Sequence, residues 1–274
     1  MAITTRARLL GALAVTAATA VTTGFVVAGA PDASAAAITP PTANAKFDYQ
    51  IGGVYEPPSG VKVVSRDREA APATGLYNIC YVNAFQTQPS EAEWWKSNHD
   101  DLLLKKSGQY VVDGEWDEIL LDVSTSAKRT AVANIVGGWI DGCATKGFNA
   151  VEPDNQDSYD RSENLLTKQN ALDFIKLIAT RAHTKGLAIA QKNTTAFGTA
   201  GKAAGLDFAV AEQCGEWSEC EDYTDVYGAN VVAIEYKDSA YSAACSAVGS
   251  KISVVRRDKL VTAPGSGTYI YKEC

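Results

Sequence analysis

The sequence lacks the short motifs that carry most cofactor-dependent and metal-dependent chemistry. Its 274 residues contain no GxGxxG or P-loop motif for a nucleotide and no GxSxG motif for a serine hydrolase. There is no CxxC pair, and the only histidines are His99 and His183, so a zinc site lacks its usual ligands. We therefore expect neither a cofactor nor a metal ion, and the chemistry must come from other side chains.

The sequence also has fewer basic than acidic residues. The chain has 25 Lys and Arg residues against 32 Asp and Glu residues, which gives a formal net charge of −7 at pH 7. A protein of this charge is repelled by nucleic acids and by anionic membranes, so we predict neither as a partner. An acidic surface is compatible with a cationic ligand, although acidity by itself often serves only solubility.

Long apolar runs are absent except at the N-terminus. Arg6 and Arg8 precede an apolar stretch over residues 9–30, and residues 33–35 (Ala-Ser-Ala) supply the small-x-small pattern of a signal peptidase site. This arrangement predicts a signal peptide over residues 1–36. The mature protein is then expected outside the cell, without a membrane span.

The rest of the chain is predicted to contain one domain after a short N-terminal segment. Residues 37–45 (AITPPTANA) are expected to form a flexible mature N-terminus. No linker-like composition follows residue 60, so residues 46–274 are predicted to form a single domain, which we expect to be monomeric.

The six cysteines all follow the predicted signal peptide. An even number of cysteines in an exported protein indicates disulfides, and six cysteines permit 15 pairings. Sequence spacing is compatible with a small loop and a tethered C-terminus, through the pairs Cys214–Cys220, Cys245–Cys274 and Cys80–Cys143.

Short strand-like runs alternate with helix-like segments. Apolar residues recur at helical spacing over residues 126–145 and 170–185. Alternation of this kind predicts a parallel sheet, and eight units in about 230 residues fit a (β/α)8 TIM barrel better than an open sheet. The eight predicted strands cover residues 48–51, 77–84, 119–124, 150–152, 188–193, 208–212, 231–236 and 252–257. A ninth run, residues 61–65, is predicted to form an extra β-hairpin near the first strand.

Polar side chains recur where these strands end. The carboxyl ends of barrel strands meet at one mouth, where barrel enzymes carry out their reactions. Carboxylates there are costly to bury unless they are solvated, paired or functional, so their clustering favours a site. Asp122 could instead cap a helix, and Glu235 could pair with a lysine. The strand-end residues are Asp122, Glu152, Asp154, Lys192, Asn193, Glu212 and Glu235.

Cleavage of a glycosidic bond fits such a cluster. One carboxylic acid protonates the leaving oxygen, and a second carboxylate attacks the anomeric carbon or activates water. Neighbouring acids raise the pKa of one carboxyl group, which keeps it protonated near neutral pH. Tyr49, Tyr159 and Tyr236 lie near strand ends and are candidates for stacking on sugar rings.

Several segments together carry a resemblance to a known family. The chain resembles glycoside hydrolase family 114, which includes endo-α-1,4-polygalactosaminidases and spherulin-4-like proteins. The resemblance covers nearly all of the predicted mature chain. Its segments are FDYQIGG (47–53), VVSRDR (63–68), NICYVNAFQTQ (78–88), LLDVST (120–125), GFNAVEPDNQDSY (147–159), GLAIAQKN (186–193), DFAVAEQC (207–214) and SVVRRD (253–258).

The resemblance implies a (β/α)8 fold, an acidic cleft, and catalytic acids after the fourth and sixth strands. These positions fall on Asp154, as nucleophile, and Glu212, as acid/base, with Glu152 and Glu235 as rivals. The implied substrate is a cationic or partly deacetylated galactosamine polysaccharide, which acidic side chains would attract. The full set of expected substrate-binding residues is Asp48, Tyr49, Asp122, Glu152, Asp157, Tyr159, Lys192, Asn193, Glu235 and Tyr236.

Two other functions remain open at this point. Because the family includes spherulin-like relatives, the barrel could bind carbohydrate or associate with the cell wall without turnover. An esterase or deacetylase is disfavoured, since the sequence has neither a GxSxG motif nor a histidine-rich metal motif.

Overall fold

The computed structural model describes residues 37–274, which form one compact unit. The predicted signal peptide, residues 1–36, lies outside the described residues. Within the described part of the chain, no helix combines the length and the apolar character needed to cross a bilayer.

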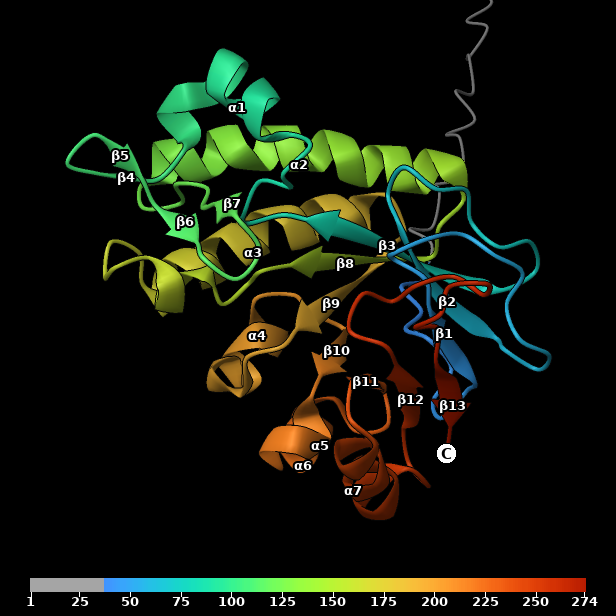
Figure 1. Cartoon of the computed structure of the whole chain (residues 1–274). Coiled ribbons are helices and arrows are strands. Elements are labelled where there is room, and N and C mark those ends of the chain that lie inside the picture. The colour runs from blue at the N-terminus through green and yellow to red at the C-terminus, as the bar shows by residue number, and fades with distance from the viewer. Residues whose placement is uncertain (1–36) are drawn as a thin grey trace, which may run out of the picture. The chain divides into compact units, whose positions relative to one another are not determined.

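A nine-stranded sheet forms the centre of the molecule (Figure 1). Eight strands are parallel and neighbour one another in chain order. The first and the last of these also pack against each other, which curls the sheet into the predicted barrel. The parallel strands are β1 (Phe47–Tyr49), β2 (Val63–Asp67), β3 (Tyr77–Asn83), β8 (Ala150–Asp154), β9 (Ala188–Lys192), β10 (Phe208–Glu212), β11 (Val231–Glu235) and β12 (Ser253–Arg257). The ninth strand, β13 (Tyr271–Glu273), is antiparallel to β12.

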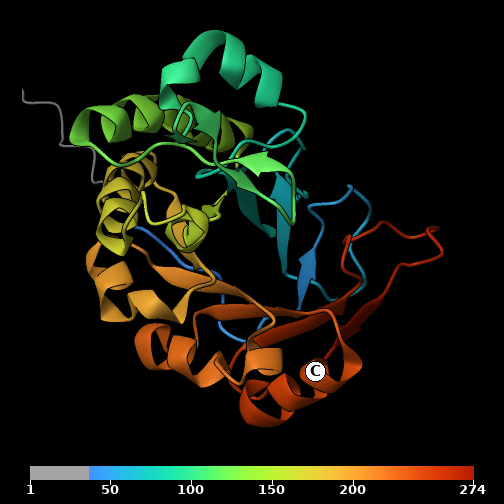
Figure 2. The ribbon, with the colours of Figure 1, turned by 60° about the vertical axis from the view of Figure 1, so that its left-hand side comes forward.

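Helices cover the outer side of the barrel except beside β1 and β2, where only loops lie (Figure 2). They are α1 (Ala92–His99), α2 (Ser126–Lys146), α3 (Lys168–Thr184), α4 (Thr199–Ala203), α5 (Cys214–Trp217), α6 (Cys220–Tyr227) and α7 (Asp238–Val248). Short 3-10 helices cover Asp100–Leu102, Ser158–Arg161 and Thr195–Phe197. The long connection between β3 and α2 also carries two small hairpins, formed by β4 (Lys105–Lys106) with β5 (Gln109–Tyr110) and by β6 (Val112–Asp113) with β7 (Glu118–Ile119).

The two longest helices confirm the helical predictions over residues 126–145 and 170–185. The side chain of Thr125 accepts a backbone hydrogen bond at the start of α2, and Thr167 does the same for α3. Gly147 ends α2 in the left-handed conformation, at φ 92°, which costs little without a Cβ atom. The helical spacing and the capping residues therefore place these two helices at the same positions.

The prediction that residues 119–124 form the third barrel strand is wrong. Only Glu118–Ile119 is a strand, β7, and it pairs with β6 outside the barrel. Leu120 and Leu121 make isolated antiparallel bridges and are fully buried in the outer hydrophobic core. A short apolar run signals burial, but its spacing does not identify the element against which it packs.

The prediction of an extra hairpin over residues 61–65 is also wrong. This run begins the barrel strand β2, which is parallel to both β1 and β3. The connections on either side of β2, residues 50–62 and 68–76, contain no helix. The alternation that marks the other strands is therefore missing here, although the count of eight barrel strands is correct.

The barrel interior is filled by apolar side chains from its strands, including Phe47 and Phe208. Residues 37–45, for which we expect flexibility, cover the amino-terminal end of this core. Ile38 packs against the interior cluster, and the Tyr77 hydroxyl donates to the backbone carbonyl of residue 39 at 2.7 Å.

Three disulfides link the elements, and among the 15 possible pairings they are the one with which the sequence spacing is compatible. Cys80 of β3 is joined to Cys143 of α2, Cys214 to Cys220 between α5 and α6, and Cys245 of α7 to the C-terminal Cys274. Disulfides of this kind persist in oxidising compartments, which fits an exported protein.

Candidate active site

A cleft of about 710 Å³ opens at the carboxyl ends of the barrel strands. Its walls come from the strand ends, from the β6–β7 hairpin, from the loop after β8, from α5 and α6, and from the loop that follows β12. This is the end of a barrel at which enzymes of this fold carry out their reactions.

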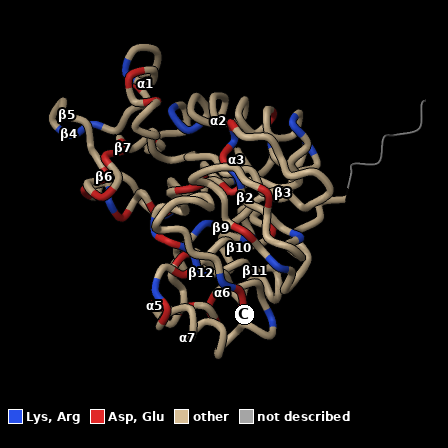
Figure 3. The backbone as a smooth tube through the Cα atoms, turned by 45° about the vertical axis from the view of Figure 1, so that its right-hand side comes forward, with Lys and Arg blue, Asp and Glu red and all other residues tan. Residues whose placement is uncertain are grey.

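The cleft is much more acidic than its surroundings. Figure 3 shows acidic and basic positions interspersed along the backbone of the whole molecule. The cleft instead presents nine acidic residues against three basic ones, Arg161, Lys192 and Lys259. The acidic residues are Asp67, Asp113, Glu115, Glu118, Asp154, Asp157, Asp160, Glu212 and Glu219. A concave surface of one charge sign concentrates ligands of the opposite sign.

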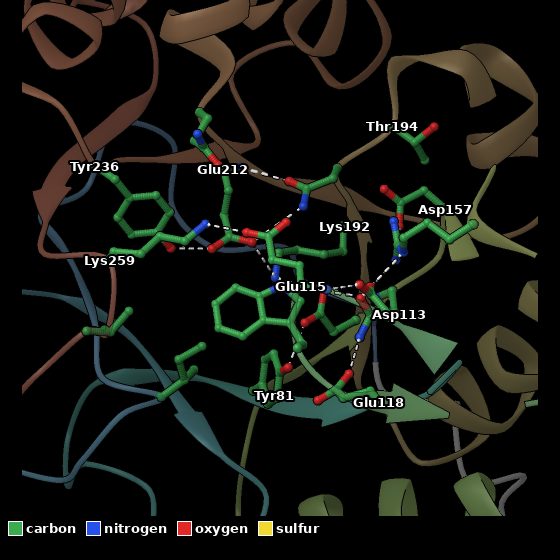
Figure 4. A pocket seen from close by; sticks show the side chains of 18 of the residues that line it. Tyr81, Asp113, Glu115, Glu118, Asp157, Lys192, Thr194, Glu212, Tyr236 and Lys259 are labelled. Carbon is green, nitrogen blue, oxygen red and sulfur yellow. Dashed lines mark hydrogen bonds and ion pairs between the residues drawn. The ribbon is translucent and has the colours of Figure 1, made fainter. Parts of the chain in front are cut away.

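Lys192, at the end of β9, lies at the centre of the cleft floor (Figure 4). Its Nζ is 3.0 Å from Asp154 Oδ1, 3.0 Å from Glu212 Oε2 and 3.1 Å from Glu152 Oε1. Burial would lower the pKa of Lys192, but the surrounding carboxylates outweigh this effect and raise it well above its ordinary value. Lys192 therefore stays charged and holds three strand ends together.

Asp154 ends β8 and is held as a carboxylate. The Tyr81 hydroxyl donates to Oδ2 at 2.6 Å, and the backbone N–H of Asn155 donates to Oδ1 at 2.8 Å. Burial would raise the pKa of Asp154, but the Lys192 ammonium and these hydrogen bonds lower it below its ordinary value. Asp154 is therefore ionised at neutral pH.

Glu212 ends β10 and faces Asp154 across Lys192. Tyr236 directly follows β11, and its hydroxyl donates to Glu212 Oε1 (Figure 4). The Asn193 side chain accepts from the Glu212 backbone N–H at 2.8 Å. Asn193 adopts φ 52°, a left-handed conformation that asparagine tolerates better than most residues. The turn after β9 thus places Asn193 against the end of β10.

Glu152, two residues before Asp154 on β8, lies deeper in the barrel. It is fully buried and does not line the cleft. It accepts hydrogen bonds from Tyr49 at 2.8 Å and from Ser65 at 2.6 Å, and burial raises its pKa. Tyr49 is equally buried, so neither residue is placed to touch a sugar in the cleft.

Asp48 and Asp122 also lie away from the cleft. Asp48 is buried where β1 meets β12 and pairs with Arg257, with Oδ1 3.0 Å from Nη1. Asp122 accepts from the Ser124 hydroxyl at 2.5 Å and from Lys128 at the start of α2. Because Thr125 is the N-cap of α2, the alternative that Asp122 caps this helix is wrong, and Asp122 pairs with the Lys128 ammonium instead.

Glu235 ends β11 but is buried beneath α5. Its Oε1 accepts the backbone N–H of Gly215 at 2.6 Å, and its Oε2 has no hydrogen-bond partner among the described residues. Burial raises the pKa of Glu235 to about 7. Glu235 lies close to Cys214 and Cys220, but both sulfur atoms are engaged in a disulfide, so this group of potential ligands cannot hold a metal ion through them.

The remaining predicted residues lie near or in the loop after β8. Asp157 lines the cleft and pairs with Arg161 at 3.0 Å. Tyr159 does not line the cleft: its hydroxyl is 3.2 Å from the Thr194 hydroxyl, and its ring packs against Phe197. The structure therefore brings Asp154, Asp157, Lys192, Asn193, Glu212 and Tyr236 together in the cleft.

Sequence reasoning missed several residues of the cleft wall. Tyr81 lies within a strand rather than at its end, and Asp67 ends the strand that we predicted as a hairpin. Lys259 lies in a loop and carries no local signal that would place it at the cleft. The strand-end rule finds residues at the ends of strands, and the resemblance added residues only within the segments that carry it.

A parallel barrel with a carboxylate-lined cleft at its mouth places the chain among the barrel enzymes. The model of glycoside-hydrolase family GH114 matches residues 28–273, and the chain belongs to this family. It is a glycosidase, and the resemblance found in the sequence is confirmed.

Solved structures agree on the fold. Ega3 of Aspergillus fumigatus, in complex with galactosamine, is 21% identical, with a TM-score of 0.70 over 86% of this chain and 97% of that one. The glycoside hydrolase domain of PelA from Pseudomonas aeruginosa is 13% identical, with a TM-score of 0.54 over 82% of this chain and 98% of that one. A comparison with curated proteins gave no match.

Proposed function

We propose that the protein is exported and cleaves internal α-1,4 linkages of a galactosamine-containing polysaccharide, with Asp154 as nucleophile and Glu212 as acid/base. The observation that carries this proposal is the meeting of the two carboxylates at one ammonium group on the cleft floor. The two residues come from strand ends 58 positions apart in the sequence, and both line the cleft.

The spacing of the pair supports a retaining reaction. Because Asp154 Oδ1 and Glu212 Oε2 each lie 3.0 Å from Lys192 Nζ, these oxygens are at most about 6 Å apart. Retaining glycosidases hold their carboxyl groups about 5–5.5 Å apart, whereas inverting enzymes need about 6.5–9.5 Å to admit a water molecule.

The environment of Asp154 supports the nucleophilic role. Asp154 is kept ionised by Lys192, Tyr81 and the Asn155 backbone, which suits a nucleophile. In the proposed first step, Glu212 gives a proton to the glycosidic oxygen while an Asp154 oxygen forms a bond to the anomeric carbon and the glycosidic bond breaks. Glu212 would then take a proton from water as that water displaces Asp154, which regenerates both groups.

The acidity of the cleft supports an amino-sugar substrate. A galactosamine unit without its acetyl group carries an ammonium group near neutral pH, and the nine acidic residues of the cleft would attract it. The cleft of about 710 Å³ has room for more than one sugar ring, as cleavage within a chain requires. The related Ega3 structure contains galactosamine.

The test is the release of new reducing ends from α-1,4-linked polygalactosamine. Wild-type protein should shorten the polymer, and Asp154→Asn and Glu212→Gln should each lower the rate by at least about 10²-fold. Asp222→Asn is the matched control, since this exposed acid on α6 does not line the cleft. Full turnover by either variant would remove that residue from the mechanism.

Two further readouts separate the alternatives. The anomer first released, followed by NMR, should keep the configuration of the substrate; an inverted product would contradict the nucleophilic role of Asp154. Binding of the polymer by folded wild-type protein without new reducing ends would instead favour a carbohydrate-binding barrel.

Export has its own test. The secreted protein should begin near residue 37, as measured by mass spectrometry of material from the culture medium. Recovery of the whole chain inside the cells only would contradict the proposal of export.

A further inference from the structure

Lys259, in the loop after β12, extends its ammonium group into the cleft (Figure 4). Its Nζ lies 3.1 Å from Glu115 Oε1 in the turn between β6 and β7. The same nitrogen is 5.1 Å from the ring centre of Trp116 and 5.6 Å from that of Tyr236. Two segments 144 positions apart therefore meet around one ammonium group.

These three neighbours form a cage with the chemistry of an ammonium-binding site. A primary ammonium within about 6 Å of an aromatic ring centre is attracted to the face of the ring, and tryptophan and tyrosine are among the best partners. The Glu115 carboxylate supplies the opposite charge and a hydrogen-bond acceptor. We define this group, Glu115, Trp116 and Tyr236, as the ammonium cage.

The ammonium cage adjoins the catalytic acids. The Tyr236 hydroxyl donates to Glu212 Oε1, so the ring that faces Lys259 belongs to the side chain that contacts Glu212. All three cage residues line the same cleft as Asp154 and Glu212. A group bound in the cage would lie on a sugar close to the one being cleaved.

Lys259 is held in the cage loosely enough to leave it. The Lys259 side chain is 48% exposed and the Glu115 side chain 65% exposed. Ion pairs at such exposure contribute little to stability, and a lysine stem has many other rotamers in solvent. No hydrogen bond of Lys259 other than that to Glu115 occurs within the described residues.

We propose that the ammonium cage of Glu115, Trp116 and Tyr236 binds the ammonium group of a deacetylated amino sugar, and that Lys259 occupies it in the free protein as a tethered competitor. The proposal rests on the proposed function and specifies how the cleft distinguishes deacetylated from acetylated units. A deacetylated unit replaces the lysine ammonium with its own, whereas an N-acetyl group has no charge with which to do so.

The test is a titration of galactosamine and of N-acetylgalactosamine into wild-type protein and Lys259→Met, followed by NMR or calorimetry. Methionine keeps much of the stem and removes the charge. If the lysine occupies the cage in about nine of ten molecules, Lys259→Met should bind galactosamine about tenfold more tightly. Binding of N-acetylgalactosamine should be the same in both proteins.

Two further proteins make the result specific. Lys237→Met removes one positive charge from an exposed ion pair with Glu216 and does not line the cleft, so it should bind galactosamine as wild type does. Adding Glu115→Gln to Lys259→Met should cancel the gain in affinity, because the cage then lacks its carboxylate.

The proposal is overturned if Lys259→Met binds galactosamine no more tightly than wild type. It is also overturned if N-acetylgalactosamine gains equally, since the lysine would then only obstruct the cleft, or if the gain survives Glu115→Gln. These are equilibrium measurements on single sugars. A failure to shorten the polymer would therefore reject the proposed function, whereas the titrations decide the cage.

Discussion

Glu235 is the buried acid whose replacement tests the electrostatics of the barrel most directly. It has no exposure to solvent, one of its oxygens has no hydrogen-bond partner within residues 37–274, and burial raises its pKa from the ordinary 4.5 to about 7. The folded protein therefore holds this proton more tightly than the unfolded chain does. Unfolding releases it between about pH 4.5 and pH 7, and the free energy of unfolding falls as the pH rises through that window.

The size of the effect follows from the two pKa values. A difference between 4.5 and about 7 corresponds to up to about 3 kcal/mol, lost in full above pH 7. Glu235→Gln keeps an oxygen that can accept from the Gly215 N–H and removes the titration. The variant should be more stable than wild type by up to about 3 kcal/mol at pH 8, and nearly equal to it at pH 4.5.

The assay is denaturant unfolding of wild type and Glu235→Gln at several pH values from 4.5 to 8. Thermal unfolding should agree, with a melting temperature about 6–12 °C higher for the variant at pH 8. Glu221→Gln, at an exposed position on α6, is the matched control and should follow the wild-type curve.

A constant difference between wild type and Glu235→Gln across this pH range would refute the reasoning, because the buried carboxyl would then not titrate. The rate of polymer hydrolysis is a second measurement on the same variant. Retained hydrolysis agrees with a role in anchoring α5, whereas lost hydrolysis in a folded variant would return Glu235 to the catalytic pair.

Three other perturbations follow from the contacts of the cleft and the barrel. Lys192→Met leaves three carboxylates without their shared cation, so the free energy of unfolding at pH 7 should fall by about 3–5 kcal/mol, and the loss should shrink in acid as the carboxylates protonate. An equal loss at all pH values would contradict this explanation. Tyr236→Phe removes a hydrogen bond to the Glu212 carboxylate, worth about 1.5–3 kcal/mol, so kcat/KM for the polymer should fall about 10- to 100-fold; an unchanged value would show that this bond has no part in the reaction. Arg257→Met leaves Asp48 buried between β1 and β12 without its ion-pair partner. Thermal unfolding should show that the free energy of unfolding falls by about 3–5 kcal/mol, and a variant as stable as wild type would contradict this explanation.

Local pattern was sufficient for much of the fold. The helices over 126–145 and 170–185 were predictable because their apolar spacing and their capping residues agree within each segment. Strand β2 and residues 119–124 were misassigned because neither has a local signal for its partner: β2 is not followed by a helix, and Leu120 and Leu121 are buried without joining the barrel.

For the site, the sequence by itself determined that acidic residues stand at the ends of barrel strands, because strand ends are marked by local composition. Only the tertiary structure decided how deeply each of these side chains is buried. Glu152 and Asp154 are two residues apart on β8, yet one is buried among Tyr49, Ser65 and Lys192 and the other lines the cleft. Depth depends on how neighbouring strands are aligned in register, which no single segment encodes. The contact of Lys259 with Glu115 and Trp116 has the same origin, since loops 144 positions apart in the sequence become neighbours only when the barrel closes.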